Sequence, residues 1–597
     1  MRRIWALCLS LLLLCAPAVV SAEPADEMAA AEGVELMELE SDAAHGEFSA
    51  GEFRNRVLPQ AVTLIRVGLA RTGTSETSDA GFDHTSSLLT ADAGFVLAKT
   101  TGEVVLQGAA GQSLTVASGT GGYTVSLDGT TYGPYTEPLS FRPVEGDKVK
   151  VTFATRVYPS TTSKQYVYRG ALELRPGVAA GSFRIVNILG LDDYLRGLAE
   201  LPTSWAMEAL KAQTVAARSY AAMRIGTPSS IQRGFDIYDS VLSQAYNGAL
   251  RETPAQDKAV AETAGLVVTY QQQVSDCYYS SSSGGHTESY EYYLAPSAAT
   301  FPGTPIPYLT GKFDSIPQWP DLDLTTEEGV RTFYSNTYPE HFDSTAASGN
   351  PYYRWTTTWT RTNLESILNT YLRTYGKTGW VAPAFETSQS IGTLQDLRVE
   401  GRGTAGKALN LVIVGSNGTW KVTREYYIRW ILRQSASVTL RSANFFLDIT
   451  RDSAGTITNV KATGGGFGHG VGMDQYGVRG MASKGYGFAE ILYHYYTGAK
   501  VSTVPLKVQR LTGVPMEEAF RQQFYSPAGG TLEVTMNGLK NLQAVVNGHM
   551  VTVNAADCNG GTCQVDISPW LQPGMNEIIY VPVGAPEGSA VVSVAVR

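Results

Sequence analysis

The stretch DDYLRGLAELPTSWAMEALKAQTVAARSYAAMRIG, from Asp192 to Gly226, contains the clearest helix of the chain. Its start signal is Pro202-Thr203-Ser204, and Arg224 followed by Gly226 is a stop signal. Many alanines allow neighbouring elements to approach closely. The pattern predicts a helix packed tightly in the fold, with Glu200 directly before it. One face of this helix, at helical spacing, carries Met207, Leu210, Thr214, Ala217 and Ala221.

Short strand-like runs dominate the chain before this helix. From Val62 onward they alternate with turns rich in Gly, Ser, Thr and Asp. After the helix, the stretch 297–380 is turn-rich and irregular, which indicates insertions over the surface. A second helix fits Phe488 to Tyr496, where Gly498 ends it. Examples of the strand-like runs are Gly122 to Leu127, Val149 to Phe153 and Phe183 to Ile188.

The pattern changes again near the C-terminus. Beyond about Val504 it shows regular alternating strands, as in 544–553 and 578–583. We therefore expect an α+β protein: a β-rich body over residues 59–503 with the alanine-rich helix along a cleft, and a separate all-β sandwich over residues 504–597. Trp570 could stack on a sugar ring, but a place in the core of the sandwich is the more common role.

The first residues have the shape of a secretory signal. Arg2 and Arg3 precede an almost entirely apolar run, and Val20-Ser21-Ala22 gives the small-residue pattern of a cleavage site. We expect residues 1–22 to be removed as a signal peptide on export; a retained membrane anchor is the alternative. Residues 23–58 are acidic and alanine-rich and are expected to form a disordered leader. Contact with a membrane is expected only through an uncleaved signal.

Composition narrows the classes of partner. The 597 residues carry a formal net charge of −9, and 61 glycines with 32 tyrosines favour a β-rich fold with many turns. An acidic chain without a basic stripe is poorly suited to a phosphate backbone, so no nucleic-acid partner is expected. Cys558 and Cys563 flank a short turn and are predicted to form a local disulfide in an oxidising compartment. Cys277 is expected to stay unpaired.

Two further segments contain polar groups suited to chemistry. YYSSSSGGHTES, from Tyr278 to Ser289, offers hydroxyls beside flexible backbone that suit hydrogen bonding to a sugar; a plain turn between strands is the alternative. GGGFGHGVGMDQYG, from Gly464 to Gly477, is so rich in glycine that its backbone must turn tightly or approach another surface closely. His469 could orient Glu200, bind substrate or tie this loop together. The predicted substrate-binding residues are Ser281, Ser282, Ser283, Gly284, His286, Thr287, Glu288, His469, Gln475 and Tyr476.

These blocks, in this order, resemble the stage II sporulation protein D (SpoIID) and amidase-enhancer (LytB) family. The resemblance implies a lytic transglycosylase that acts on peptidoglycan glycan strands already stripped of stem peptides. Such an enzyme cuts between N-acetylmuramic acid and N-acetylglucosamine and leaves 1,6-anhydro-muramyl ends. The family's catalytic glutamate corresponds to Glu200, although Gly197-Leu198-Ala199 departs from the polar run usual before it. The likeness covers most of residues 60–503 and includes IRVGL from Ile65, YRGALEL from Tyr168, FDIYDSVLSQAYNG from Phe235, PYLTGKFDS from Pro307 and HYYTG from His494.

Physical reasoning fits an acid/base role for Glu200. An acid that protonates a leaving oxygen must stay partly protonated, and apolar packing by Leu198, Leu201 and Trp205 would raise the pKa of the carboxyl. The N-terminus of the following helix opposes this by only about 0.3–1 kcal/mol. The alternative is that Glu200 simply caps that helix.

A lytic transglycosylase needs only one carboxyl, because the sugar's own 6-hydroxyl attacks. A hydrolase would need a second carboxylate to activate water or act as nucleophile. We expect the single-carboxylate arrangement. The candidates for a second carboxylate are Asp192, Asp193, Glu288 and Asp474.

No cofactor and no required metal are expected. The histidines are scattered and the HExxH pattern of zinc peptidases is missing. Cys277 with His286 would be the first pair to test for zinc. The expected partners are glycan strands of the cell wall, with which the secreted protein would associate during wall remodelling or sporulation. In the alternative, the protein is a non-catalytic wall-binding enhancer of an N-acetylmuramoyl-L-alanine amidase.

Overall fold

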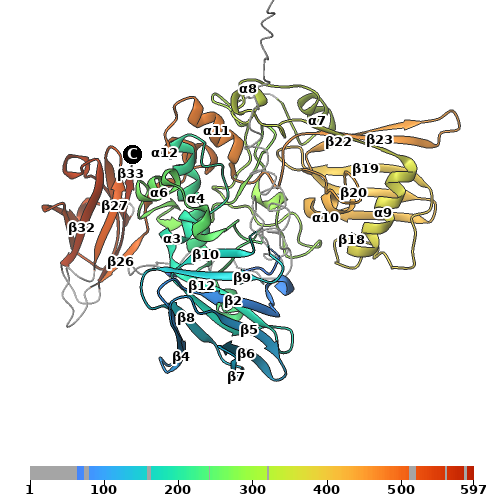
Figure 1. Ribbon diagram of the computed structural model, residues 1–597. Helices are drawn as coiled ribbons and strands as arrows, with labels where there is room; N and C mark the ends of the chain where they lie inside the picture. The colour runs from blue at the N-terminus through green and yellow to red at the C-terminus, as the bar shows by residue number, and fades with distance from the viewer. Residues whose placement is uncertain are drawn as a thin grey trace, which may run out of the picture.

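The computed structural model describes residues 64–72, 79–156, 163–240, 242–318, 322–509, 520–558, 561–583 and 588–596. The predicted signal peptide and acidic leader lie outside these residues. The described chain is a mixed α+β structure made mostly of strands, with helices gathered at its centre and β-rich units around them (Figure 1). Among the described residues, no helix has both the length and the apolar character needed to cross a bilayer.

The chain before the central helices forms two sheets that share one core. Their strand orders are β13-β1-β12-β11-β8-β3-β4 and β10-β9-β2-β5-β6-β7. Alternate residues face inward, as Val149, Val151 and Phe153 do in β9, so the β-rich start expected from the sequence is confirmed. The strands are β1 (Leu64–Gly68), β2 (Ser86–Thr90), β3 (Phe95–Lys99), β4 (Val104–Gly108), β5 (Leu114–Gly119), β6 (Gly122–Leu127), β7 (Thr130–Tyr135), β8 (Leu139–Pro143), β9 (Lys148–Phe153), β10 (Gln165–Arg169), β11 (Ala171–Pro176), β12 (Phe183–Gly190) and β13 (Ile237–Tyr238).

The predicted alanine-rich helix is α4 (Met207–Arg224), which lies in the middle of the molecule (Figure 1). Every residue from Ala209 to Ala222 is buried, because small side chains let neighbours pack against all of its faces. The helix is confirmed as an element, whereas its bordering a cleft stays a prediction. The central elements near it are α3 (Leu191–Arg196), α5 (Pro228–Arg233), α6 (Pro254–Ala261), β14 (Leu266–Tyr270), α11 (Gln475–Ser483) and α12 (Phe488–Tyr495), the last matching the second predicted helix.

A further β-rich unit lies at the right of Figure 1. It contains one sheet of order β17-β23-β22 and another of order β18-β21-β20-β19. Its strands are β17 (Trp355–Thr360), β18 (Val381–Ala382), β19 (Leu394–Arg402), β20 (Ala408–Gly415), β21 (Gly418–Thr423), β22 (Phe445–Arg451) and β23 (Ile457–Gly464). The helices of this part of the chain are α7 (Glu327–Tyr334), α8 (Thr345–Ser348), α9 (Arg361–Tyr375) and α10 (Glu425–Ile431).

The stretch 297–380 is less irregular than its sequence suggested. It contains α7, β17 and the 15-residue helix α9. The Thr360 side chain caps α9 by accepting a hydrogen bond from the Asn363 N–H. The sequence reading missed this helix because its apolar stripe stands among many Thr, Tyr and Arg residues. That stripe consists of Leu364, Ile367, Leu368 and Leu372, all buried.

The C-terminal strands also form two sheets. One has the order β27-β32-β29-β30, and the other contains β26, β28, β31 and β33. The second sheet continues from β33 through β25 (Lys500–Thr503) to β14 and β15 (Gln273–Val274). A single sheet therefore extends across residue 504, where the sequence placed a domain boundary. The strands are β26 (Leu506–Gln509), β27 (Arg521–Ser526), β28 (Gly530–Asn537), β29 (Asn541–Val546), β30 (His549–Asn554), β31 (Thr562–Asp566), β32 (Gly574–Val583) and β33 (Ser589–Val596).

The cysteines behave as the sequence predicts. Cys558 and Cys563 form a disulfide directly before and within β31. Cys277 is buried and has no disulfide partner among the described residues, and burial raises the pKa of its thiol well above the usual range. Trp570 is half-buried and packs against the core without being part of its buried interior, so the choice between its two roles stays a prediction.

Candidate active site

Glu200 lies in the link between α3 and α4. The carboxylate accepts a hydrogen bond from the Ala245 backbone N–H at 2.7 Å, and the neighbouring Ala199 N–H donates to the Ala245 carbonyl at 2.8 Å. The residue is only 6% exposed. α4 begins at Met207, and its cap residue, Ala206, makes no side-chain capping bond. The helix-cap alternative is therefore wrong: Glu200 is held by a neighbouring loop.

A chain of polar side chains leads to the Glu200 carboxyl. The Tyr194 hydroxyl donates to Gln244 Oε1 at 3.0 Å, and Gln244 Nε2 donates to the Tyr279 hydroxyl at 2.7 Å. Because that hydroxyl accepts from Gln244, its own hydrogen is available for Glu200, to which Tyr279 and Gln475 are both hydrogen-bonded. The Gln475 side chain also approaches the Glu200 carbonyl at 3.4 Å.

Burial raises the pKa of Glu200 to about 7, against the opposing hydrogen bonds from the Ala245 N–H, Tyr279 and Gln475. This is the direction expected from apolar packing, and the buried Leu201 and Trp205 are among its neighbours in sequence. A carboxyl with this pKa exists in both protonation states near neutral pH. Such a group can donate a proton and take one back.

Two of the carboxylates considered for a second catalytic role, Asp192 and Asp193, form ion pairs with arginines. Asp192 pairs with Arg218 at 3.0 Å, and Asp193 pairs with Arg196 at 3.1 Å. Both side chains are substantially exposed. The Asp193–Arg196 contact is a surface ion pair, which offers little stabilisation, whereas Asp192 pairs with the buried Arg218.

Glu288 is fully buried, and its carboxylate anchors a loop from the unit at the right of Figure 1. It accepts hydrogen bonds from the backbone N–H groups of Ser289 at 2.9 Å, Thr404 at 2.8 Å and Ala405 at 3.2 Å. The Thr404 hydroxyl donates to it as well. Burial raises the pKa of Glu288 in spite of the nearby Lys407 charge. Glu288 was predicted to bind substrate, but its acceptor sites are already used within the protein.

The two motifs singled out in the sequence lie side by side. β16 (Tyr279–Ser280) pairs in parallel with β24 (Met473–Asp474), and Ser282 exchanges backbone hydrogen bonds with Phe467 at 3.1 and 2.8 Å. Glycine is required at this contact. A Cβ on Gly472 would lie 2.2 Å from the Tyr278 carbonyl oxygen, and Gly472 has φ +74°. The close approach predicted for the glycine-rich loop is confirmed.

The serine motif directs its donors inward. Asp343 Oδ2 accepts from the Ser282 hydroxyl at 3.1 Å and from the N–H groups of Gly284 and Gly285 at 2.9 and 3.1 Å. The Ser283 N–H donates to Asp474 Oδ2 at 2.6 Å. These groups were expected to bind sugar. In the structure they hold two aspartates, because a run of N–H groups beside a turn binds carboxylates well.

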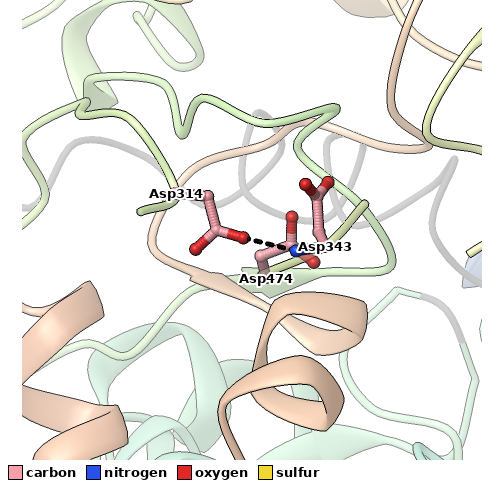
Figure 2. A group of neighbouring side chains, drawn as sticks. All are labelled: Asp314, Asp343 and Asp474. Atoms are coloured by element: carbon pink, nitrogen blue, oxygen red, sulfur yellow. Dashed lines mark hydrogen bonds between the residues drawn. The ribbon is translucent and has the colours of Figure 1, made fainter. Parts of the chain in front are cut away.

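Asp314 completes a cluster of three buried aspartates with Asp343 and Asp474 (Figure 2). One carboxylate oxygen from each lies within 4.8 Å of the others. Burial, with the Asp314 charge next in effect, raises the pKa of Asp474 to about 7. Burial and the charges of Asp474 and Asp314 raise the pKa of Asp343 well above its usual range. Sequence reasoning named Asp474 only as a possible second carboxylate and missed Asp314 and Asp343.

The predicted histidines are buried and neutral. His469 Nδ1 accepts from the Val471 N–H at 3.0 Å, its ring contacts Tyr278 and Tyr293, and burial lowers its pKa to about 3. Of its three open roles, these contacts favour tying the loop together. His286 lies 2.6 Å from the Thr287 carbonyl through Nδ1, and burial lowers its pKa to about 4.

The remaining predicted binding residues have mixed surroundings. Thr287 donates from its N–H to the Lys312 carbonyl at 2.8 Å and is buried. The Tyr476 N–H donates to the Ser281 carbonyl at 3.1 Å, and the Tyr476 ring lies 5.5 Å from that of Trp205. Tyr476 and Gln475 are thus the predicted binding residues nearest the Glu200 link. Neither Cys277 nor His286 belongs to the metal-ligand cluster found in the described residues.

Comparison with known proteins agrees with this arrangement. Residues 179–270 match the model of the family described as stage II sporulation protein, and residues 295–472 match a domain of unknown function (DUF8618). Glu200 lies in the first matched segment, and Asp314 and Asp343 lie in the second.

Three curated relatives align with about half of the chain. The amidase enhancer of Bacillus subtilis is 28% identical over 319 residues, which are 51% of this chain and 39% of the relative. An uncharacterized protein of Brachyspira hyodysenteriae is 31% identical over 320 residues, 53% of this chain and 68% of the relative. Stage II sporulation protein D of Bacillus subtilis is 26% identical over 332 residues, 53% of this chain and 76% of the relative. The chain belongs to the stage II sporulation protein D and amidase-enhancer family.

Proposed function

We propose that the protein is a peptidoglycan lytic transglycosylase that uses Glu200 as its single acid/base. The observation that carries the proposal is a buried carboxyl with a pKa of about 7, at the position where the family resemblance puts the catalytic glutamate. Hydrogen bonds from the Ala245 N–H and Tyr279 fix its orientation, and they stabilise the carboxylate once it has given up its proton.

The chemistry needs one group to act twice. Protonated Glu200 donates its proton to the glycosidic oxygen as the bond from C1 of N-acetylmuramic acid to that oxygen breaks. The resulting carboxylate then accepts the proton of the sugar's 6-hydroxyl as this oxygen bonds to C1. The products are a 1,6-anhydro-muramyl end and a free N-acetylglucosamine hydroxyl, and Glu200 is protonated again. No water enters, which is why a second carboxylate to activate water is unnecessary.

The preference for peptide-free strands rests on the family resemblance alone. The sequence offered Ser281 and Ser282 as sugar-binding groups, but Ser282 donates to Asp343 and is buried. Tyr476 and Gln475 contact the Glu200 link, which makes them the candidates to meet a glycan there, although both are as deeply buried as Ser281. Binding of intact and amidase-treated wall material to the pure protein tests this preference.

The second candidate function is a non-catalytic enhancer of a wall amidase. The 28% identical relative named amidase enhancer favours it, as does the 6% exposure of Glu200, since a substrate must reach that carboxyl. In that case the protein would bind the wall and an amidase without cutting glycan. Secretion to the cell wall is proposed for both functions.

Glu200→Gln separates the two functions, because it keeps size and hydrogen bonding but removes the transferable proton. With peptide-free glycan, wild-type protein is expected to release 1,6-anhydro-muramyl ends detectable by mass spectrometry. The variant should be roughly 10²–10⁴-fold slower. Glu328→Gln, an exposed position on α7, is the matched control and should cleave like wild type. Absence of cleavage by wild type, with stimulation of an added amidase, would instead support the enhancer.

A further inference from the structure

The three-aspartate cluster joins segments that lie far apart in sequence. Asp314 and Asp343 come from the segment that matches the domain of unknown function, whereas Asp474 ends the glycine-rich loop and directly precedes Gln475. All three residues are at most 1% exposed. Figure 2 shows their side chains gathered between loops above α11.

Most acceptor sites of the cluster are filled, but one is not. Asp314 Oδ1 accepts from the Tyr495 hydroxyl at 2.7 Å, and Asp314 Oδ2 accepts from the Asp343 N–H at 2.9 Å. Asp474 accepts from the N–H groups of Ser283 and Gly477. Asp343 Oδ2 has three donors, whereas Oδ1 of this fully buried carboxylate has no N–H or hydroxyl donor among the described residues; the other contact of the Asp343 carboxyl is with that of Asp474, which requires a shared proton. An unpaired buried carboxylate oxygen is costly and indicates a missing occupant.

The charge of the cluster is only partly compensated by its neighbours. In the part of the chain that the structure describes, the only side-chain ion pair with these aspartates is that of His494 with Asp314, at 3.1 Å. One proton shared between Asp343 and Asp474 would still leave two negative charges in the interior. Buried carboxylates this close together are neutralised either by bound protons or by a bound cation.

We propose that Asp314, Asp343 and Asp474 bind a calcium ion, with the free oxygen of Asp343 as a direct ligand. The donors are all oxygen, which selects a hard cation over zinc. Two ligands on opposite sides of one calcium ion are about 4.6–5.2 Å apart, since Ca–O distances are roughly 2.3–2.6 Å. The three oxygens, within 4.8 Å of one another, fit that span. The ion would fasten the 295–472 segment to the loop that carries Gln475, and so hold the Glu200 surroundings in place.

This inference differs from the sequence-based expectation that no metal is required. That expectation came from the absence of zinc motifs, whereas the cluster becomes visible only when three distant aspartates meet. It is also independent of the proposed cleavage, because the ion would be structural and would not touch the substrate.

The test is calcium uptake by the full mature chain. Protein treated with a chelator and then dialysed is titrated with calcium chloride, and bound metal is counted after gel filtration. We expect one calcium per chain and a melting temperature that rises with calcium concentration. Asp343→Asn should weaken calcium binding at least tenfold and abolish the rise in melting temperature. Asp92→Asn, at an exposed aspartate of the N-terminal sheets, should behave like wild type.

Magnesium, manganese and zinc, each added alone, complete the experiment. Uptake of none of the four ions at millimolar concentration overturns the proposal and leaves a shared proton as the occupant. Uptake of zinc only would overturn the assignment to a hard cation. If Asp343→Asn binds calcium as tightly as wild type, Asp343 is not a ligand and the proposed site is wrong. If Asp343→Asn does not fold, the calcium content of wild type is compared with that of Asp474→Asn. One calcium in wild type and none in Asp474→Asn supports the site, and equal calcium contents overturn it.

Discussion

Glu200 and the three-aspartate cluster both lie beside the short strand pair β16 and β24, yet they treat buried charge in opposite ways. Glu200 is alone: polar but uncharged side chains surround it, and burial alone brings its pKa to about 7. The aspartates are crowded: besides burial, the Asp314 charge raises the pKa of Asp474, and the charges of Asp474 and Asp314 raise that of Asp343. A single buried carboxyl without charged neighbours can exchange its proton. Several buried carboxyls close together need a bound proton or cation to neutralise their charge. The consecutive residues Asp474 and Gln475 belong one to each site.

The largest expected difference between the sites is in cleavage. Glu200→Gln should lower cleavage by roughly 10²–10⁴-fold with little change in calcium-dependent melting. Asp343→Asn should do the reverse: the calcium-dependent rise in melting temperature disappears, while cleavage per folded molecule falls less than tenfold. Kinetic assays and melting curves on the same preparations measure both. Equal losses of cleavage in the two variants would show that the sites are not separate in function.

The second prediction concerns stability and pH. Because the folded pKa of Glu200 is raised from 4.5 to about 7, its contribution to stability is fully present below pH 4.5 and is lost as pH rises through 7. The total is about 3 kcal/mol. Glu200→Gln does not titrate, so its melting temperature relative to wild type should rise from pH 5 to pH 8. The exposed Glu328→Gln should show no such trend. A constant difference between Glu200→Gln and wild type would mean that Glu200 is not held protonated.

A third prediction probes the packing around the aspartates. A Cβ on Gly477 would lie 2.0 Å from the Tyr495 hydroxyl and 2.6 Å from Asp314 Oδ2. Gly477→Ala should therefore lower stability by about 1–3 kcal/mol, despite the better helix propensity of alanine. At Gly487, the N-cap residue of α12, the nearest atom would be 3.6 Å away, so Gly487→Ala should cost only the roughly 0.5–1 kcal/mol of replacing a glycine cap by alanine. Thermal melting compares the two. Unchanged stability of Gly477→Ala would show that the cluster can expand.

The smallest predicted effect is at Tyr279. Removing its hydroxyl in Tyr279→Phe deletes one hydrogen bond that lowers the pKa of Glu200, so that pKa should rise further. In the proposed mechanism cleavage requires protonated Glu200, so its rate is expected to fall on the alkaline side near pH 7. In the variant this alkaline limb should shift upward, with a loss of about tenfold in rate at its optimum. Tyr580→Phe removes a buried hydroxyl in the C-terminal sheets and should leave the pH profile in place. A profile unchanged in Tyr279→Phe would remove Tyr279 from the site.

The sequence predicted Glu200 because a carboxyl directly before an alanine-rich helix is a local pattern, and because the family resemblance puts the catalytic glutamate there. It did not reveal Asp314 and Asp343, since these are ordinary aspartates in a stretch that looked irregular and meet Asp474 only through the fold. The sequence identified the segment from Tyr278 to Ser289 as a source of hydrogen-bond donors, but it did not show whether those donors face a ligand or the interior of the protein. In the structure the donors of Ser282, Ser283 and Gly284 face aspartates inside the protein. Tyr279 was passed over because its link to Glu200 depends on Gln244, from a third segment.

The sheet that continues from β14 through β25 to β33 bears on how the molecule assembles. β33 (Ser589–Val596) pairs with β25, β26 and β28. Those three strands are synthesised before β33, so their pairing with it can form only after residues 589–596 have been made. Until then β25, which already pairs with β14, presents an open edge. Contacts between residues so far apart in sequence form slowly. Folding of the central helices and β14 is therefore tied to synthesis of β33, and a ribosome-bound chain lacking β33 is the form most exposed to aggregation.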